Sequence, residues 1–148
     1  MADAREVVQI DYVEEAVRLA RQSAHFNNLS PVRHVVADWR NFPIHEQFYL
    51  LIGSDFLYLP ATFPYLKKIF ASSLAPGSKL VIADPGHFDS LRLLQEMKEE
   101  GWHWEENIIP VRQGNYSYDI HIFQGSKACA NSAPGISADQ QASRWDTE

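Results

Sequence analysis

The stretch Phe48–Ala83, FYLLIGSDFLYLPATFPYLKKIFASSLAPGSKLVIA, contains a complete strand–helix–strand unit. Phe48–Ile52 is an apolar run without alternation, which predicts a strand covered on both faces. Pro60 suits the first turn of a helix, and apolar residues then recur at helical spacing until Pro76-Gly77 ends it. Leu80–Ala83 is a second apolar strand. The unit predicts two parallel strands joined by a helix.

The same alternation extends toward the N-terminus. Glu6–Ile10 is short, apolar and β-branched, which predicts a buried strand. Tyr12–Asn27 carries apolar residues at helical spacing, and Asp11 with Glu14 resembles a capping box at its start. Val32–Val36 is a further strand. The chain therefore begins as strand, helix, strand.

The pattern changes after the next helix, which Asp89 can cap and which runs to Glu100. Trp102–Val111 and Tyr116–Gln124 are two long strand candidates, and the Gly114-Asn115 pair between them suits a hairpin turn. We therefore expect an antiparallel hairpin after the alternating part of the chain.

Composition predicts one globular domain, residues 1–127, and a tail, residues 128–148. The tail is poor in apolar residues, and Ala130–Glu148 is predicted to be disordered. The 148 residues are 45% hydrophobic and carry a net charge of −6, so no nucleic-acid partner is expected. A single cysteine, Cys129, and no long apolar run predict a cytoplasmic protein that does not enter a membrane.

Four acidic residues follow the predicted strands. Alternating strands and helices imply a mostly parallel sheet with helices on both faces. Ligands of such sheets bind beyond the carboxyl ends of the strands. Asp11, Asp38, Asp55 and Asp84 all stand at those ends. The sequence therefore predicts a binding edge lined with carboxylates.

Five motifs follow one another along residues 6–126: VVQID at residues 7–11, ADW at 37–39, IGSDFLY at 52–58, LAPGSKLVIADPG at 74–86, and the closing hairpin. In this order they resemble the class I S-adenosylmethionine-dependent methyltransferases, closest to the family 16 branch that includes protein-lysine methyltransferases. The resemblance implies a Rossmann-like three-layer sandwich, S-adenosylmethionine as cofactor, and methyl transfer to a protein lysine or another amine.

The resemblance implies a cofactor site at Asp11, Tyr12, Asp38, Trp39 and Ser54. Asp11 matches the acid that accepts hydrogen bonds from the ribose hydroxyls, and one carboxylate can accept from two neighbouring hydroxyls. Asp38 and Trp39 match the pair around the adenine. The structural alternatives are a helix N-cap for Asp11, and a loop acid followed by a packed tryptophan for the pair.

Asp55 and Tyr58 match an Asp-x-x-Tyr signature that, in the lysine-modifying members, faces the methyl acceptor. The acid would orient the amine, and orientation supplies much of the catalysis in an in-line displacement. The alternative is that Asp55 ends a strand and Tyr58 packs beneath the next helix. Asp84-Pro85-Gly86 resembles the loop after the family's fifth strand, which shapes the acceptor pocket; the alternative, which we favour, is a simple turn. The six histidines lack metal spacing, so no metal site is expected.

The glycine-rich loop that this family carries after its first strand has no counterpart here, and the first strand of this chain corresponds to the family's second. In the family that strand is central, so its loss leaves backbone groups unpaired. Three explanations are open: a gene start placed too late, a true truncation, or direct pairing of the strands at Val7 and Leu50. A catalytically silent remnant or interaction module is the alternative function, and a different α/β nucleotide-binding fold is a third.

Overall fold

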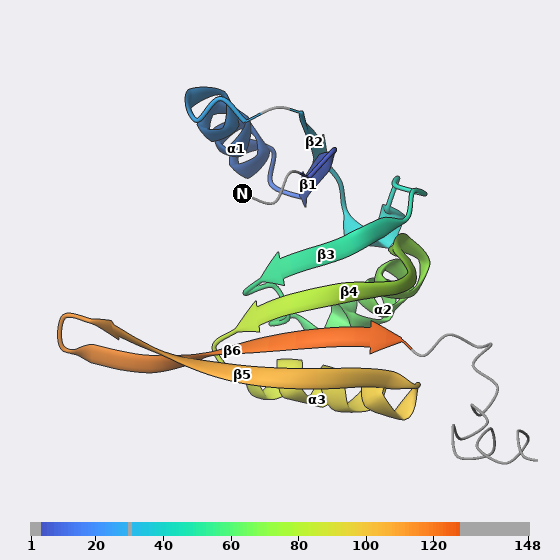
Figure 1. Cartoon of the computed structure of the whole chain (residues 1–148), viewed down its shortest axis with the longest axis vertical. Helices are drawn as coiled ribbons and strands as arrows, with labels where there is room; N and C mark the ends of the chain where they lie inside the picture. Colours follow the sequence, from blue (N-terminus) through green and yellow to red (C-terminus); the bar gives the residue numbers. More distant parts are fainter. Residues whose placement is uncertain (1–3, 30, 128–148) are drawn as a thin grey trace, which may run out of the picture.

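The computed structural model describes residues 4–29 and 31–127 (Figure 1). Strands and helices alternate until a final hairpin, as predicted. None of the helices in these ranges is long and apolar enough to cross a membrane. The elements are β1 Val7–Asp11, α1 Glu14–Phe26, β2 Val32–Val36, the 3-10 turn η1 Trp39–Asn41, β3 Phe48–Ser54, the 3-10 turn η2 Pro60–Thr62, α2 Phe63–Ser73, β4 Leu74–Asp84, α3 Phe88–Glu99, β5 Trp102–Gln113 and β6 Tyr116–Lys127.

The strands form two separate hydrogen-bonded sheets. β1 and β2 pair in parallel, and the other four strands follow the order β3-β4-β6-β5. β3 and β4 are parallel, whereas β6 is antiparallel to both β4 and β5. Gly114, with φ +60°, and Asn115 connect the two hairpin strands, as expected from the sequence. The predicted Rossmann-like α/β class, with a mostly parallel sheet and a C-terminal hairpin, is confirmed.

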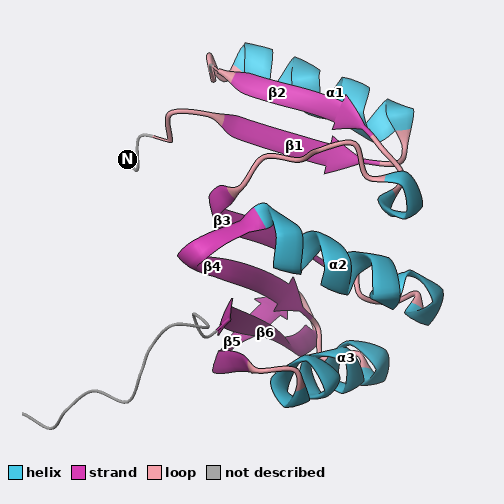
Figure 2. Ribbon diagram, turned by 90° about the vertical axis from the view of Figure 1, so that its right-hand side faces the viewer, coloured by secondary structure: helices cyan, strands magenta, loops and turns pink. Residues whose placement is uncertain are grey.

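The sheet is interrupted between β1 and β3. No strand pairing joins these two strands within the part of the chain that the structure describes. The direct pairing of the strands at Val7 and Leu50, one of the three explanations above, is therefore wrong. Figure 2 shows β2, β1, β3 and β4 following one another, so the unpaired edges of β1 and β3 are turned toward each other.

The hydrophobic core lies between the four-stranded sheet and the helices α2 and α3, which cover the same face of it (Figure 2). A fully buried leucine contributes about 1.5–3 kcal/mol, so this cluster is the main source of stability. The buried members are Leu57, Phe63, Leu66, Phe70, Leu74, Leu80, Ile82, Leu93, Leu94, Met97, Trp102 and Phe123.

The opposite face of β3 is open. Leu51 packs against the core, but Leu50 is 50% exposed and Ile52 is 74% exposed. The prediction that both faces of Phe48–Ile52 are covered is therefore wrong. A strand sequence without alternating apolar and polar residues shows only that both faces of the strand are apolar. It does not show that other elements of the chain pack against both faces.

Three local predictions also differ from the structure. The side chain of Asp11 accepts from the backbone N–H of Val13 (2.9 Å), but Val13, not Asp11, is the N-cap of α1. Asp89 lies inside the first turn of α3, whose N-cap is His87. Pro76-Gly77 belongs to β4, because α2 already ends at Ser73. The predicted tail, Ala130–Glu148, lies outside the described residues.

Candidate functional site

The four acids identified from the sequence lie at the carboxyl ends of their strands, as predicted. Asp11 and Asp84 are the last residues of β1 and β4. Asp38 follows β2 by two residues, and Asp55 follows β3 directly. The break between β1 and β3 divides them into two groups. Asp11 and Asp38 belong to the two-stranded sheet, and Asp55 and Asp84 to the four-stranded one.

A left-handed turn fixes the position of Asp55. Its N–H donates to the carbonyl oxygen of Ala83 (2.9 Å), which extends the β3–β4 pairing by one step. Its φ is +49°, a conformation that aspartate tolerates better than most non-glycine residues. The chain therefore leaves the sheet sharply here, and the side chain of Asp55 remains two-thirds exposed at the edge.

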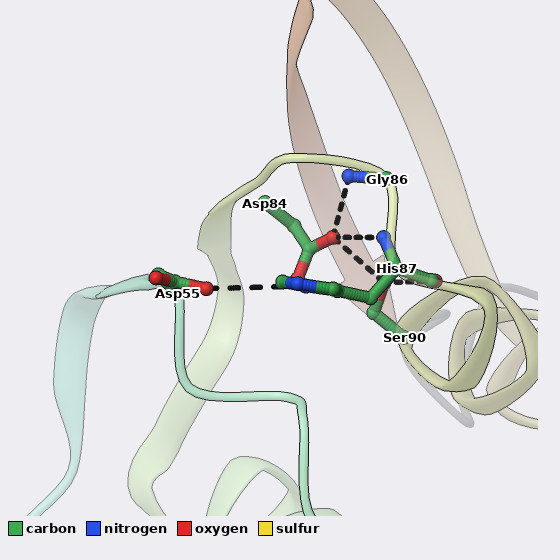
Figure 3. A network of polar contacts seen from close by, with 5 residues as sticks. All are labelled: Asp55, Asp84, Gly86, His87 and Ser90. Atoms are coloured by element: carbon green, nitrogen blue, oxygen red, sulfur yellow. Dashed lines mark hydrogen bonds and ion pairs between the residues drawn. The ribbon is translucent and has the colours of Figure 1, made fainter.

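Asp84 is buried and held by the loop that follows it. Its Oδ1 accepts hydrogen bonds from the N–H of Gly86 (2.7 Å), the N–H of His87 (2.8 Å) and the hydroxyl of Ser90 (2.8 Å) (Figure 3). Burial acts to raise the pKa of this carboxyl, but the bonds from His87, Ser90 and Gly86 outweigh it and hold the pKa below its usual value of 3.8. Asp84 is thus a buried anion at neutral pH.

The imidazole of His87 lies between the two carboxylates of the four-stranded sheet (Figure 3). Its Nδ1 is 3.4 Å from Oδ2 of Asp84 and 3.9 Å from Oδ1 of Asp55. One ligand atom from each of the three residues lies within 4.8 Å of the others. Such a group can orient an imidazole and hold a cation or an amine. As a metal site it offers three ligand atoms, half of the six that Mg²⁺ takes.

Asp11 retains one free carboxylate oxygen. Its Oδ1 accepts from the N–H of Val13, while Oδ2 has no hydrogen-bond partner among residues 4–29 and 31–127. The neighbouring ring of Tyr12 is 61% exposed. Both side chains are therefore accessible at the end of β1, and the carboxylate can still accept from a hydroxyl pair.

Asp38 and Trp39 already have partners within the chain. The Nε of Arg40 donates to Oδ1 and Oδ2 of Asp38, and its N–H donates to Oδ1 at 2.9 Å. These bonds, the side-chain ones first, lower the pKa of Asp38 to about 2. The half-buried ring of Trp39 meets the ring of Phe56 edge-on, with centroids 5.8 Å apart. The packing role weighed for Trp39 is present.

The segment after β3, residues 56–58, contains both buried and exposed side chains. Leu57 is fully buried and Phe56 packs between Trp39 and Phe70, whereas Tyr58 is 56% exposed. The alternative in which Tyr58 packs beneath the next helix is therefore wrong. Ser54 is exposed at the end of β3 and makes no side-chain hydrogen bond with the described residues.

The base of the hairpin closes the far side of this site. His121 pairs with Asp84 in the β4–β6 register, and its Nδ1 lies 2.6 Å from Oε1 of Glu106. Gly86, with φ +86°, passes so close that a Cβ there would lie 2.9 Å from Nε2 of His121. A shallow hollow of about 300 Å³ lies toward the other end of β4, beside Lys79 and Trp104, and contains none of these residues.

Comparison with known proteins finds no matching family model and no matching curated protein. Solved structures do match. An rRNA methylase from Streptococcus thermophilus superposes with a TM-score of 0.63 at 15% identity, over 84% of this chain and 75% of the other. A putative methyltransferase from Thermoplasma acidophilum superposes with a TM-score of 0.66 at 19% identity, over 83% of this chain and 57% of the other. The N-methyltransferase NodS from Bradyrhizobium japonicum, solved with S-adenosyl-l-homocysteine, superposes with a TM-score of 0.59 at 17% identity, over 83% of this chain and 68% of the other.

The chain has the fold of these methyltransferases. It spans 57% of the Thermoplasma protein and larger shares of the other two. The identities are low, so the likeness establishes the architecture and leaves the reaction and substrate to the residues of this chain.

The sequence places Asp84 among the strand-terminal acids but does not indicate the contribution of the residues that follow it. Asp84-Pro85-Gly86 is interpreted as a simple turn, and His87 is one of the six histidines that lack metal spacing. The turn is real, but it also anchors Asp84 and presents His87 to Asp55. The available signal was a strand-terminal aspartate with Ser90 six residues later, at the start of a helix.

Proposed function

We propose that this chain is an S-adenosylmethionine-dependent methyltransferase whose acceptor is an amine nitrogen, of a protein lysine or of a smaller molecule. One observation carries the proposal. On a methyltransferase fold, acids stand at the carboxyl ends of four strands, and two of these acids, Asp55 and Asp84, lie on either side of the His87 ring.

Of the residues at the ends of β1 and β2, some are free to bind the nucleoside of the cofactor and one is already paired within the chain. Oδ2 of Asp11 is available to the ribose hydroxyls, and the exposed ring of Tyr12 offers a flat surface beside it. The carboxylate of Asp38 would have to exchange Arg40 for the adenine amine. When bound, the cofactor supplies a methyl group on a positively charged sulfur.

The residues of the four-stranded sheet would serve the acceptor. Asp55 and Tyr58 are accessible and can hold an amine. In the transfer, the nitrogen lone pair would take up the cofactor's methyl group as the C–S bond breaks and its electron pair stays on sulfur. The nitrogen then releases a proton, which we assign to the imidazole of His87. The buried anion Asp84 lies beside Nδ1 of that ring and orients it.

A binding module without catalysis is the second candidate, favoured by the break between β1 and β3. This break separates Asp11 and Asp38 from Asp55 and Asp84, so one ligand would have to bridge two sheets. Calorimetry with S-adenosylmethionine, together with transfer of a labelled methyl group to polylysine, separates the two candidates. Micromolar binding with label transfer supports the enzyme. No heat at millimolar cofactor and no transfer would refute it.

A further inference from the structure

Asp84 is a buried anion without a lysine or arginine beside it. Its side chain is fully buried, and within residues 4–29 and 31–127 its only ion-pair partner is the imidazole of His87, which is also the only one of Asp55. Buried charges in proteins are paired or coordinate a metal ion. An imidazole can be neutral at physiological pH, unlike a guanidinium or an ammonium group. Two carboxylates therefore share one imidazole, and the group can accept a further cation.

The two oxygens of Asp84 are not equally satisfied. Oδ1 accepts from three donors, at 2.7 Å from Gly86 and at 2.8 Å from His87 and Ser90. Oδ2 has one hydrogen-bond contact in the described part of the chain, 3.4 Å from Nδ1 of His87, which is longer than the usual N–H···O distance of about 2.7–3.2 Å. A buried carboxylate oxygen is thus left without a close partner, and it points toward the ring of His87 (Figure 3).

The distances between the three side chains suit a small ion. Nδ1 of His87 lies 3.4 Å from Oδ2 of Asp84 and 3.9 Å from Oδ1 of Asp55, and one ligand atom of each residue lies within 4.8 Å of the others. A tetrahedral Zn²⁺ ion holds nitrogen and oxygen ligands at about 2.0–2.2 Å, which places them about 3.3–3.6 Å apart. The pair of Asp84 and His87 already has this spacing. The side chain of Asp55 is two-thirds exposed, so a small rotation can bring its oxygen into range.

The backbone holds these ligands in place. The N–H of Asp55 donates to the carbonyl oxygen of Ala83 at 2.9 Å, so the loops after β3 and β4 start side by side. The N–H groups of Gly86 and His87 fix Asp84 through Oδ1. Carboxylates that ligate metals are hydrogen-bonded in this way, because such bonds orient the ligand. The ion would therefore meet a preformed set of ligands.

We propose that Asp55, Asp84 and His87 bind one Zn²⁺-like transition-metal ion, with water in the fourth position. One imidazole nitrogen and two carboxylate oxygens favour such an ion over Mg²⁺ and Ca²⁺, which take about six or more oxygen ligands. Histidine spacing could not indicate this site, because two of the three ligands are aspartates and the three come from two loops. The proposal does not depend on methyl transfer. Where that reaction occurs, the ion and the acceptor amine compete for Asp55 and His87.

Calorimetry with zinc chloride on the full chain, in a buffer that does not chelate metals, tests the proposal. We expect about one equivalent to bind with micromolar or stronger affinity at neutral pH, and magnesium chloride to bind at least about a hundredfold more weakly. NMR of the imidazole nitrogens gives a second readout. Zinc should shift Nδ1 of His87 and leave the rings of His25 and His34 unchanged. No binding at millimolar zinc, or shifts confined to other histidines, overturns the proposal.

Matched variants of the chain locate the ion. His87→Gln and Asp55→Asn each remove one ligand and should weaken zinc binding about a hundredfold. Asp55→Asn keeps the turn, because asparagine also accepts the φ of +49°. His25→Gln and Asp89→Asn make the same changes elsewhere and should leave binding unchanged, as should Cys129→Ser at the single cysteine. Losses in these controls equal to those in the ligand variants, or a loss in Cys129→Ser alone, would refute the site.

Discussion

Oδ2 of Asp84 lies 3.4 Å from Nδ1 of His87, at the point where β4 ends and α3 begins. Asp84 is 1% exposed, whereas the side chain of His87 is about half exposed. The pair therefore connects the interior of the four-stranded sheet to its accessible edge. A substitution of Asp84 is expected to change how the imidazole of His87 is held at that edge.

Replacing Asp84 by asparagine should destabilise the fold by about 1–3 kcal/mol at neutral pH, because the three donors to Oδ1 lose a charged acceptor in a buried loop. Urea unfolding measures this change. Asp89→Asn, at a more exposed acid nearby, is the control and should change stability by less than about 0.5 kcal/mol.

The same carboxyl predicts how stability depends on acid. Its folded pKa is lowered, so ionised Asp84 stabilises the fold above the usual value of 3.8, and this contribution is lost as pH falls through the folded value. The free energy of unfolding, measured at a series of decreasing pH values, should fall less steeply below pH 3.8 in Asp84→Asn than in the natural chain. Equal slopes would show that this carboxyl does not retain its charge in the fold.

His87→Gln tests the proposed proton acceptor. We expect about a hundredfold lower rate of methyl transfer with an unchanged dissociation constant for S-adenosylmethionine, since the ring is assigned to the acceptor side. His25→Gln, on α1, is the control. A rate that falls only because the cofactor binds more weakly would contradict the assignment.

Asp11→Ala tests the cofactor edge. Removing the free oxygen of this carboxylate should weaken S-adenosylmethionine binding at least about tenfold, because hydrogen bonds to a charged acceptor contribute about 1.5–3 kcal/mol each. Glu14→Ala removes a nearby acid from the first turn of α1 and should leave affinity unchanged. Calorimetry makes the comparison, and a similar loss in both variants would indicate a general effect of charge.

Arg40→Ala tests whether Asp38 can be released. The pKa of Asp38 should rise from about 2 toward its usual 3.8, which NMR titration of the carboxyl carbon detects. If Asp38 binds the adenine amine, freeing both oxygens should also tighten adenosine binding. Weaker binding in Arg40→Ala would show that the pair acts as a unit and that Asp38 does not exchange partners.

Elements with a strong local pattern were predictable from the sequence. The valine-rich stretch Val32–Val36 forms β2 as expected, and Gly114-Asn115 makes the hairpin turn because glycine accepts positive φ there. Asp55 and Asp84 could be placed at one edge because parallel strands end together. Local propensity and strand direction were sufficient for these features.

Features that depend on distant neighbours were not predictable. The exposure of Ile52 depends on what lies over β3, and a strand of FYLLI composition looks the same whether covered or open. The contact of His87 with Asp55 requires two loops from different strands to meet. The ion pair of Asp38 with Arg40 is local, but a solvent-exposed arginine has many alternative partners in a sequence.

The hairpin extends beyond the sheet that anchors it. β6 pairs with β4 only between His121 and Gly125, whereas its pairing with β5 continues out to Tyr116. The outer part is therefore a two-stranded ribbon that projects beyond the rest of the sheet (Figure 1). The ribbon joins the sheet at His121, and a Cβ on Gly86 would lie 2.9 Å from Nε2 of this histidine, so the base of the ribbon leaves no room for a side chain in the loop after β4.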